Sequence, residues 1–267
     1  MKTFPKLKPR LNEILHLLYR FRFLNRIQIQ VLLGHKYHSK ILMWLKELTE
    51  GKYIRKYYDK KFAASPTIYC LGYIGRKYLK DNPGNSPEFK DIKLGLLDRV
   101  WREKTLSQEF REHCIFIADI FLSLGTLMKK TKGKLHFSTK TDLYGTEHLI
   151  SPSPDAYFAI EEKSGNIKRY FLDVFDDIHP KRMRQRVWQY FNYYENNNWQ
   201  DHTNKPFPEI LLVCPNERLK KHLYYYIQNK LKRDELYLGF YLSVRQTIKS
   251  EGLRREMLQK VEGEVKI

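Results

Sequence analysis

The sequence has few cysteines, no long apolar segment and a shortage of acidic residues. Its three cysteines, Cys70, Cys114 and Cys214, match no CxxC or zinc-knuckle spacing, so we expect reduced thiols and no disulfide framework. No segment approaches the ~18 uninterrupted apolar residues of a membrane span. No apolar stretch follows the charges of the first ten residues, so no signal peptide is expected. These absences predict a cytoplasmic protein with no membrane partner.

The shortage of acidic residues is concentrated in one part of the chain. The whole sequence carries 49 Lys and Arg against 30 Asp and Glu, a net charge of +19. Residues 1–80 hold 18 of these basic residues and 4 of the acidic ones, a net charge of +14. A basic surface favours polyanionic partners, because binding releases the counterions condensed on the polyanion. The localised charge therefore predicts that residues 1–80 bind nucleic acid.

The first eighty residues have the pattern of three helices followed by a two-stranded hairpin. Apolar residues at helical spacing predict helices over residues 10–23 and from residue 39 to a stop at Gly51. Between them, Asn25 and Gln28 have the spacing of a capping box and predict the start of a short second helix. Two strand-like runs and a closing helix complete the unit, over residues 53–58, 67–71 and 74–79.

This order resembles the winged-helix superfamily. The segments RFLNRIQIQVLLG, SKILMWLKELTEGKYI and TIYCLGYIGRKYL are similar to its second helix, its recognition helix and its wing strand with the closing helix. The resemblance implies that the third helix enters the major groove of double-stranded DNA and that the hairpin lies on a phosphate backbone. Trp44 and Leu45 are expected in the core. The candidate DNA-binding residues are Lys36, Tyr37, His38, Lys40, Arg55, Lys56, Lys60 and Lys61.

Residues 81–105 are rich in Pro, Gly, Asn and Asp and predict a linker between two domains, 1–80 and 106–267. In the second domain, helical and strand-like periodicities follow one another in the order α-β-β-β-α-β, with a further helix and strand. We expect these elements over residues 108–128, 135–139, 156–160, 167–175, 181–195, 210–214, 217–232 and 236–244. This order resembles the restriction-endonuclease-like fold, so the expected fold class is α+β or α/β.

Two carboxylates strengthen the resemblance to nucleases. Asp155 follows Pro154 at the start of the second strand and Asp173 lies inside the third, as in PD-(D/E)xK nucleases. A hairpin brings both carboxylates together, where they can hold Mg²⁺. The metal would activate a water molecule and stabilise charge on the phosphate.

The sequence departs from the nuclease pattern at one position. Phe175 stands two residues after Asp173, where the pattern has a lysine. Lys181 on the next helix is the candidate replacement for that lysine, and Glu112 or Glu109 is the candidate third metal ligand. Because the lysine is missing, we favour a DNA-binding role. The alternative is a Mg²⁺-dependent endonuclease or nickase that uses Asp155 and Asp173.

The whole chain resembles the replication-relaxation family encoded on plasmids and other mobile elements. The residues that carry the resemblance are the Pro154-Asp155 turn, the strand over residues 171–175 and the QYFNYY segment over residues 189–194. The family strand reads roughly F-x-E-x-D, so Asp173 replaces its Glu and Phe175 its second acid. The resemblance implies a sequence-specific or structure-specific DNA-binding protein in plasmid replication, DNA processing or its regulation. Its second domain would add DNA contacts, self-association as a homodimer, or both.

Overall fold

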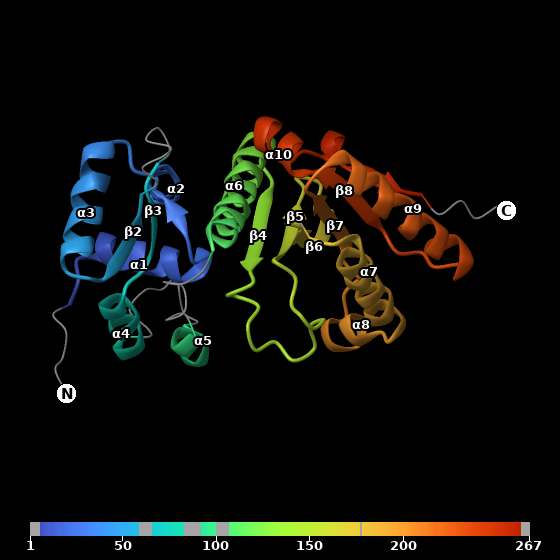
Figure 1. The fold of residues 1–267 in the computed structure, drawn as a ribbon, viewed down its shortest axis with the longest axis horizontal. Coiled ribbons are helices and arrows are strands. Elements are labelled where there is room, and N and C mark those ends of the chain that lie inside the picture. Colours follow the sequence, from blue (N-terminus) through green and yellow to red (C-terminus); the bar gives the residue numbers. More distant parts are fainter. Residues whose placement is uncertain (1–5, 59–65, 83–91, 100–106, 177, 263–267) are drawn as a thin grey trace. The chain divides into compact units, whose positions relative to one another are not determined.

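The computed structural model describes residues 6–58, 66–82, 92–99, 107–176 and 178–262 (Figure 1). The chain divides into two compact units, Met1–Leu122 and Ser123–Ile267. This boundary lies inside helix α6 (Gln108–Thr131), whereas the sequence predicts a linker over 81–105. Part of the predicted linker is helix α5 (Leu94–Arg99). No helix within the described ranges is both long enough and apolar enough to cross a membrane.

The first unit packs helices around a small antiparallel sheet. The elements in chain order are α1 (Pro9–Phe21), β1 (Leu24–Asn25), α2 (Arg26–Leu32), α3 (His38–Glu50), β2 (Ile54–Tyr57), β3 (Ile68–Leu71) and α4 (Tyr73–Asp81). The strands pair in the order β1-β3-β2. Three helices followed by an antiparallel hairpin form the winged-helix arrangement that the sequence predicts. Strand β1 was not predicted, because its two residues are too few to show an alternating pattern.

Local signals in the sequence set the ends of these elements. The Asn25 side chain accepts a hydrogen bond from the Gln28 backbone nitrogen at 2.9 Å, and the Gln28 side chain accepts one from the Asn25 nitrogen at 3.0 Å. The predicted capping box at the start of α2 is therefore formed. Helix α3 buries Ile41, Leu45 and Leu48, and half-buried Trp44 packs against the same core, as predicted.

Helix α4 lies very close to the backbone of the strand segment before β2. A Cβ atom at Gly75 would lie 2.1 Å from the carbonyl oxygen of Tyr53, so no larger residue fits there without a shift of the backbone. This close approach lets Tyr78 and Leu79 of α4 reach the core, where they are almost completely buried. The closing helix thereby fixes the hairpin to the three-helix core.

The first half of α6 belongs to the first unit because it makes specific contacts there. The Gln28 side-chain nitrogen donates hydrogen bonds to the carbonyl oxygen of Ile115 at 2.8 Å and to Asp119 Oδ1 at 2.6 Å. Phe23, Cys70 and Cys114 form a small buried cluster beside these contacts. Cys70, Cys114 and Cys214 form no disulfide with one another, and all three are buried. The winged-helix core therefore extends beyond residue 80 and includes part of α6.

The second unit is built on a six-stranded mixed sheet. Its strands lie side by side in chain order: β4 (Lys134–Thr139), β5 (Ala156–Glu161), β6 (Ile167–Val174), β7 (Glu209–Cys214), β8 (Phe240–Val244) and β9 (Gln259–Val261). The pairs β6·β7 and β7·β8 are parallel and the others are antiparallel. Strand β7 is buried on both faces, which explains its continuous apolar run from Ile210 to Val213.

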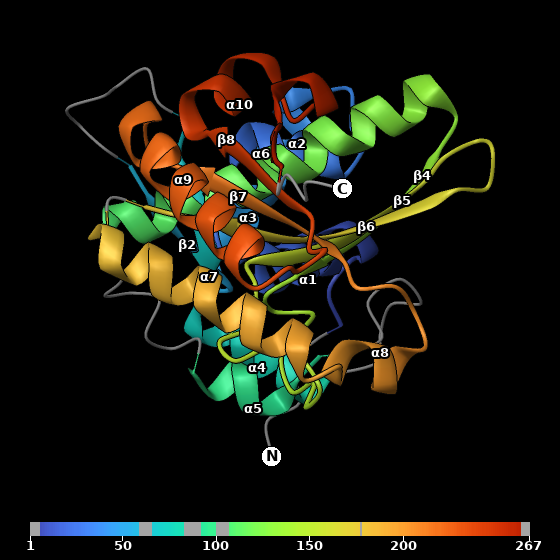
Figure 2. The same cartoon turned by 90° about the vertical axis from the view of Figure 1, so that its right-hand side faces the viewer.

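Helices α7 (Pro180–Glu195) and α9 (Glu217–Arg233) cover the same face of this sheet (Figure 2). Met183, Phe191 and Ile227 are among the side chains that they bury against it. The order α6-β4-β5-β6-α7-β7 agrees with the predicted α-β-β-β-α-β order, with α8 (Asn198–Thr203) inserted before β7. The predicted strand over residues 236–244 begins only at Phe240. Two further elements complete the unit, α10 (Arg245–Glu251) and the short helix Arg255–Met257.

Candidate functional site

The first candidate site is the surface around the start of α3. Lys36, Tyr37, His38 and Lys40 are all exposed, and the Tyr37 side chain is 62% accessible. His35 orders this turn, because its Nδ1 accepts a hydrogen bond from the Tyr37 nitrogen at 3.2 Å and its ring contacts Trp44 edge-on. The four predicted residues are therefore presented together at one end of α3.

The outward face of α3 continues this surface. Leu42 and Met43 are 45% and 49% exposed, whereas Ile41 and Leu45 beside them are buried. Exposed apolar side chains on a helix that is otherwise well packed are a feature of surfaces that contact a partner. His38, Ser39, Lys40, Leu42 and Met43 are exposed at the start of α3, whereas Ile41 between them is buried.

Strand β2 carries the second part of the basic surface. Arg55 and Lys56 are exposed on this strand, while Ile54 is buried. Tyr58 follows with 54% of its surface exposed, an aromatic residue outside the predicted DNA-binding set. Lys60 and Lys61, which were also predicted to bind DNA, lie outside the described residues.

The charges on this surface are not neutralised within the described part of the first unit. Lys36, Lys40, Arg55 and Lys56 form no ion pair there, whereas Lys46 lies 3.8 Å from Glu50. A cation without an internal partner keeps its full charge for an external anion. Four cations from two adjacent elements can therefore act together on a polyanion.

The second candidate site is the carboxylate pair of the second unit. Asp155 precedes β5 and Asp173 lies in β6, and the backbone nitrogen of Asp155 donates a hydrogen bond to Asp173 Oδ1 at 3.3 Å. Asp155 Oδ2 in turn accepts a hydrogen bond from the Val174 nitrogen at 2.9 Å. The hairpin thus brings the two acids together, as the sequence predicts.

Buried Arg186 forms an ion pair with Asp173, one of the two carboxylates. Arg186 Nε donates to Asp173 Oδ2 at 2.6 Å, and Tyr190 Oη donates to the same oxygen at 2.7 Å. Arg186 Nη1 also donates to the carbonyl oxygen of Pro152 at 2.7 Å. Burial by itself lowers the pKa of Arg186, but the Asp173 carboxylate outweighs this effect and raises the pKa above its ordinary value. Burial and the same carboxylate also raise the pKa of Tyr190.

The lysine next to the acids is not the predicted one. Lys140 Nζ lies 3.3 Å from Asp155 Oδ1, while the side chain of Lys181 is exposed on the first turn of α7. Lys140 could have been selected from the strand pairing, since its backbone nitrogen bonds the Asp155 carbonyl oxygen just beyond the β4·β5 ladder. The Phe175 side chain, at the lysine position of the nuclease pattern, is buried in the core.

The predicted metal ligands do not make a magnesium site in this arrangement. Among the described residues, no group of three or more His, Cys, Asp and Glu side chains could hold a metal ion. Glu112 is exposed on α6 and accepts a hydrogen bond from Gln108 Nε2 at 2.9 Å. Both oxygens of Asp173 are engaged by Arg186, whose positive charge stands where a cation would be needed. The residues present therefore do not fit Mg²⁺, and no chemical step is derived from it.

The fold and the site define a protein of two units. The first is a basic winged helix, and the second is a mixed α/β unit in which a buried arginine forms an ion pair with one of two adjacent carboxylates. The model of the replication-relaxation family matches residues 15–210, and the chain belongs to this family. No curated protein matches the sequence.

Some solved structures show a weak likeness. A variant of ZitR from Lactococcus lactis is 16% identical with a TM-score of 0.28, over 49% of this chain and 79% of that one. The adhesin competence repressor AdcR from Streptococcus pyogenes is 18% identical with a TM-score of 0.28, over 45% of this chain and 81% of that one. Likenesses at this level carry no conclusion about the present protein.

Proposed function

We propose that the protein binds double-stranded DNA through its first unit and acts in the replication or processing of a mobile element. Helix α3 would enter the major groove, with Lys36 and Lys40 on the phosphates beside it and the outward residues of α3 on the base edges. Arg55 and Lys56 of β2 would contact the neighbouring phosphate backbone. The family to which the chain belongs supports the link to replication.

One observation carries this proposal. Exposed cations from the start of α3 and from β2 lie on the two elements that a winged helix applies to DNA, and they have no acidic partner among the described residues. If this surface bound a protein through apolar contacts, its charge would have no role. A polyanionic ligand accounts for the net charge of +14 that is concentrated in residues 1–80.

The second unit would contribute binding without cleavage. Its α-β-β-β-α-β order supports a restriction-endonuclease-like fold. In that fold the carboxylate pair is the catalytic centre, yet here Arg186 neutralises Asp173 and Phe175 is buried in the core. We therefore propose a nuclease-like unit that has kept the architecture and replaced the metal by an internal cation.

Duplex binding is tested by charge reversal in the first unit. Lys36→Glu/Lys40→Glu should weaken binding to a labelled duplex at least about tenfold. The slope of log K against log salt should fall by roughly 0.9 for each phosphate that the variant no longer neutralises. The matched control is Lys129→Glu/Lys130→Glu, which makes the same change in net charge at exposed positions of α6 in the second unit. An equal weakening in both variants would contradict a local site on α3.

A further inference from the structure

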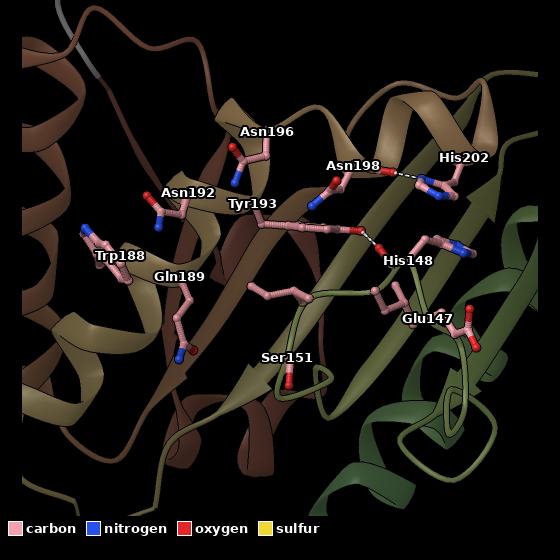
Figure 3. Close-up of a pocket in the computed structure, with 12 residues that line it drawn as sticks. Glu147, His148, Ser151, Trp188, Gln189, Asn192, Tyr193, Asn196, Asn198 and His202 are labelled. Atoms are coloured by element: carbon pink, nitrogen blue, oxygen red, sulfur yellow. Dashed lines mark hydrogen bonds between the residues drawn. The ribbon is translucent and has the colours of Figure 1, made fainter.

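A pocket of about 490 Å³ opens in the second unit between the 147–151 loop, α7 and α8 (Figure 3). This volume lies within the usual range for small-ligand sites, about 300–1,000 Å³. Figure 3 shows Trp188, Gln189 and Asn192 on the α7 side and Asn198 and His202 on the α8 side. The lining is polar and aromatic and contains none of the residues of the carboxylate pair.

Four of the twelve residues that line the pocket carry a side-chain amide: Gln189, Asn192, Asn196 and Asn198. Gln189 Oε1 accepts a hydrogen bond from Arg186 Nη1 at 3.2 Å, so its amide NH₂ group is left for a ligand. The side-chain amides of Asn192, Asn196 and Asn198 make no hydrogen bond with any described residue, although all three line the pocket. Arg186 bonds both Asp173 and Gln189, so it links the carboxylate pair to the wall of the pocket and orients the Gln189 amide.

Aromatic rings accompany these amides. Trp188 is 49% exposed, and no ring of a described residue packs against its face. His148 and His202 stack on each other at 5.3 Å with an angle of 10° between their planes. Tyr193 is buried and donates a hydrogen bond to the His148 carbonyl oxygen at 2.7 Å. The pocket therefore has an exposed indole face on one side and, on the other, side chains that are held in place by ring stacking and a hydrogen bond.

The exposed face of α7 leads from this pocket to positive charge. Lys181, Gln185, Trp188 and Asn192 follow one another at spacings of four, three and four residues, so they lie along one side of the helix. Lys181 and Arg182 at the start of α7 are exposed and form no ion pair with any described residue. A cationic end followed by an exposed indole and amides is the composition of surfaces that hold a single nucleic-acid strand.

We propose that this pocket binds an unpaired nucleobase. Trp188 would stack on the base, and the amides of Gln189 and Asn192 would bond its edge, as amides do with the N6 and N7 atoms of adenine. Lys181 and Arg182 would hold the adjoining phosphates of a single DNA strand. The proposal goes beyond duplex binding, because it assigns a second and independent site to the second unit. The same base chemistry is offered by a free nucleotide, so the experiment distinguishes the two sources.

The test measures binding of a short fluorescent oligodeoxyadenylate to the full chain by anisotropy. Trp188→Ala and Asn192→Ala should each raise the Kd, by about tenfold for Trp188 because stacking carries much of the binding of a base. Tyr225→Ala is the matched control, since Tyr225 is 51% exposed on α9 of the same unit. An abasic strand of equal charge should bind more weakly and should not respond to Trp188→Ala.

Two further arms separate the outcomes. Lys36→Glu/Lys40→Glu should reduce duplex binding and leave the effect of Trp188→Ala on the single strand unchanged, so this site and the proposed duplex site can fail separately. Competition by adenosine monophosphate would assign the pocket to a free nucleotide, and its absence would assign it to a strand. The proposal is overturned if Trp188→Ala and Asn192→Ala, with unchanged circular dichroism, bind oligodeoxyadenylate and the mononucleotide as the unsubstituted protein does.

Discussion

Replacing Arg186 by methionine should strongly destabilise the second unit, because the substitution leaves a buried carboxylate without its cation. Asp173 is 6% exposed and Arg186 is 9% exposed, so water cannot replace the missing partner. The substitution also removes the hydrogen bonds of Arg186 to the Pro152 carbonyl oxygen at 2.7 Å and to Gln189 at 3.2 Å. Methionine is shorter than arginine but keeps its unbranched apolar stem and much of its volume, so the effect reports the missing charge and hydrogen bonds more than a cavity.

The expected loss is about 3–5 kcal/mol in the free energy of unfolding, the usual cost of removing one partner of a buried ion pair. The double variant Asp173→Asn/Arg186→Met should lose less than Arg186→Met alone, by about 1–3 kcal/mol. The asparagine oxygen can accept one of the two hydrogen bonds that Asp173 receives, from Tyr190 at Oδ2 or from the Asp155 nitrogen at Oδ1, and the side chain carries no charge that needs a cation.

Urea unfolding followed by far-ultraviolet circular dichroism measures these differences. Arg182→Met is the control, since it makes the same substitution at an exposed position of the same helix and should change stability by less than about 0.5 kcal/mol. A loss below about 1 kcal/mol for Arg186→Met would refute the conclusion that the pair is a buried internal ion pair. So would a double variant that is less stable than Arg186→Met.

Other predictions follow from single features of the structure. Millimolar Mg²⁺ should leave the Tm unchanged, and Asp155→Ala/Asp173→Ala should not alter the products when supercoiled DNA is incubated with the protein; cleavage that disappears in that variant, while its circular dichroism matches that of the unsubstituted protein, would establish the endonuclease alternative. Gly75→Ala should cost more than about 2 kcal/mol of stability because its Cβ would meet the Tyr53 carbonyl oxygen at 2.1 Å. Gly125→Ala, with nothing within 4 Å of its Cβ, should stabilise α6 by up to about 1 kcal/mol, so equal effects of the two would contradict the close approach. Burial lowers the pKa of His16 to about 4, so the unfolded chain binds the proton first and the free energy of unfolding falls as the pH drops from roughly 6.5 to about 4. His16→Leu should flatten that part of the stability profile, measured by thermal unfolding across pH; a profile parallel to that of the unsubstituted protein would contradict the assignment.

Local signals explain why much of the fold could be predicted. The capping box of Asn25 and Gln28 needs only residues three apart, and the apolar spacing in α3 fixes which side of that helix faces the core. The doubly buried run of β7 is likewise a pattern within one element. Elements without such a pattern, such as β1 and α8, were missed.

Contacts between distant residues could not be predicted in the same way. Gln28 bonds Asp119 across 91 positions, and this contact is one reason why the first unit extends into α6. Arg186 was one of several basic residues near the start of α7, and nothing in its local sequence distinguishes it from Arg182 or Arg184. Its role depends on which side of α7 faces β6.

The sequence by itself determined the basic winged-helix unit, because its charge is a sum over residues and its helices are marked by local spacing and caps. It also determined that Asp155 and Asp173 meet, since a hairpin brings its two strands together whatever surrounds them. Only the tertiary structure determined which cation lies next to these acids. The packing of α7 on the sheet places Arg186 beside Asp173, and a buried carboxylate is stable only when a cation and hydrogen bonds compensate its charge.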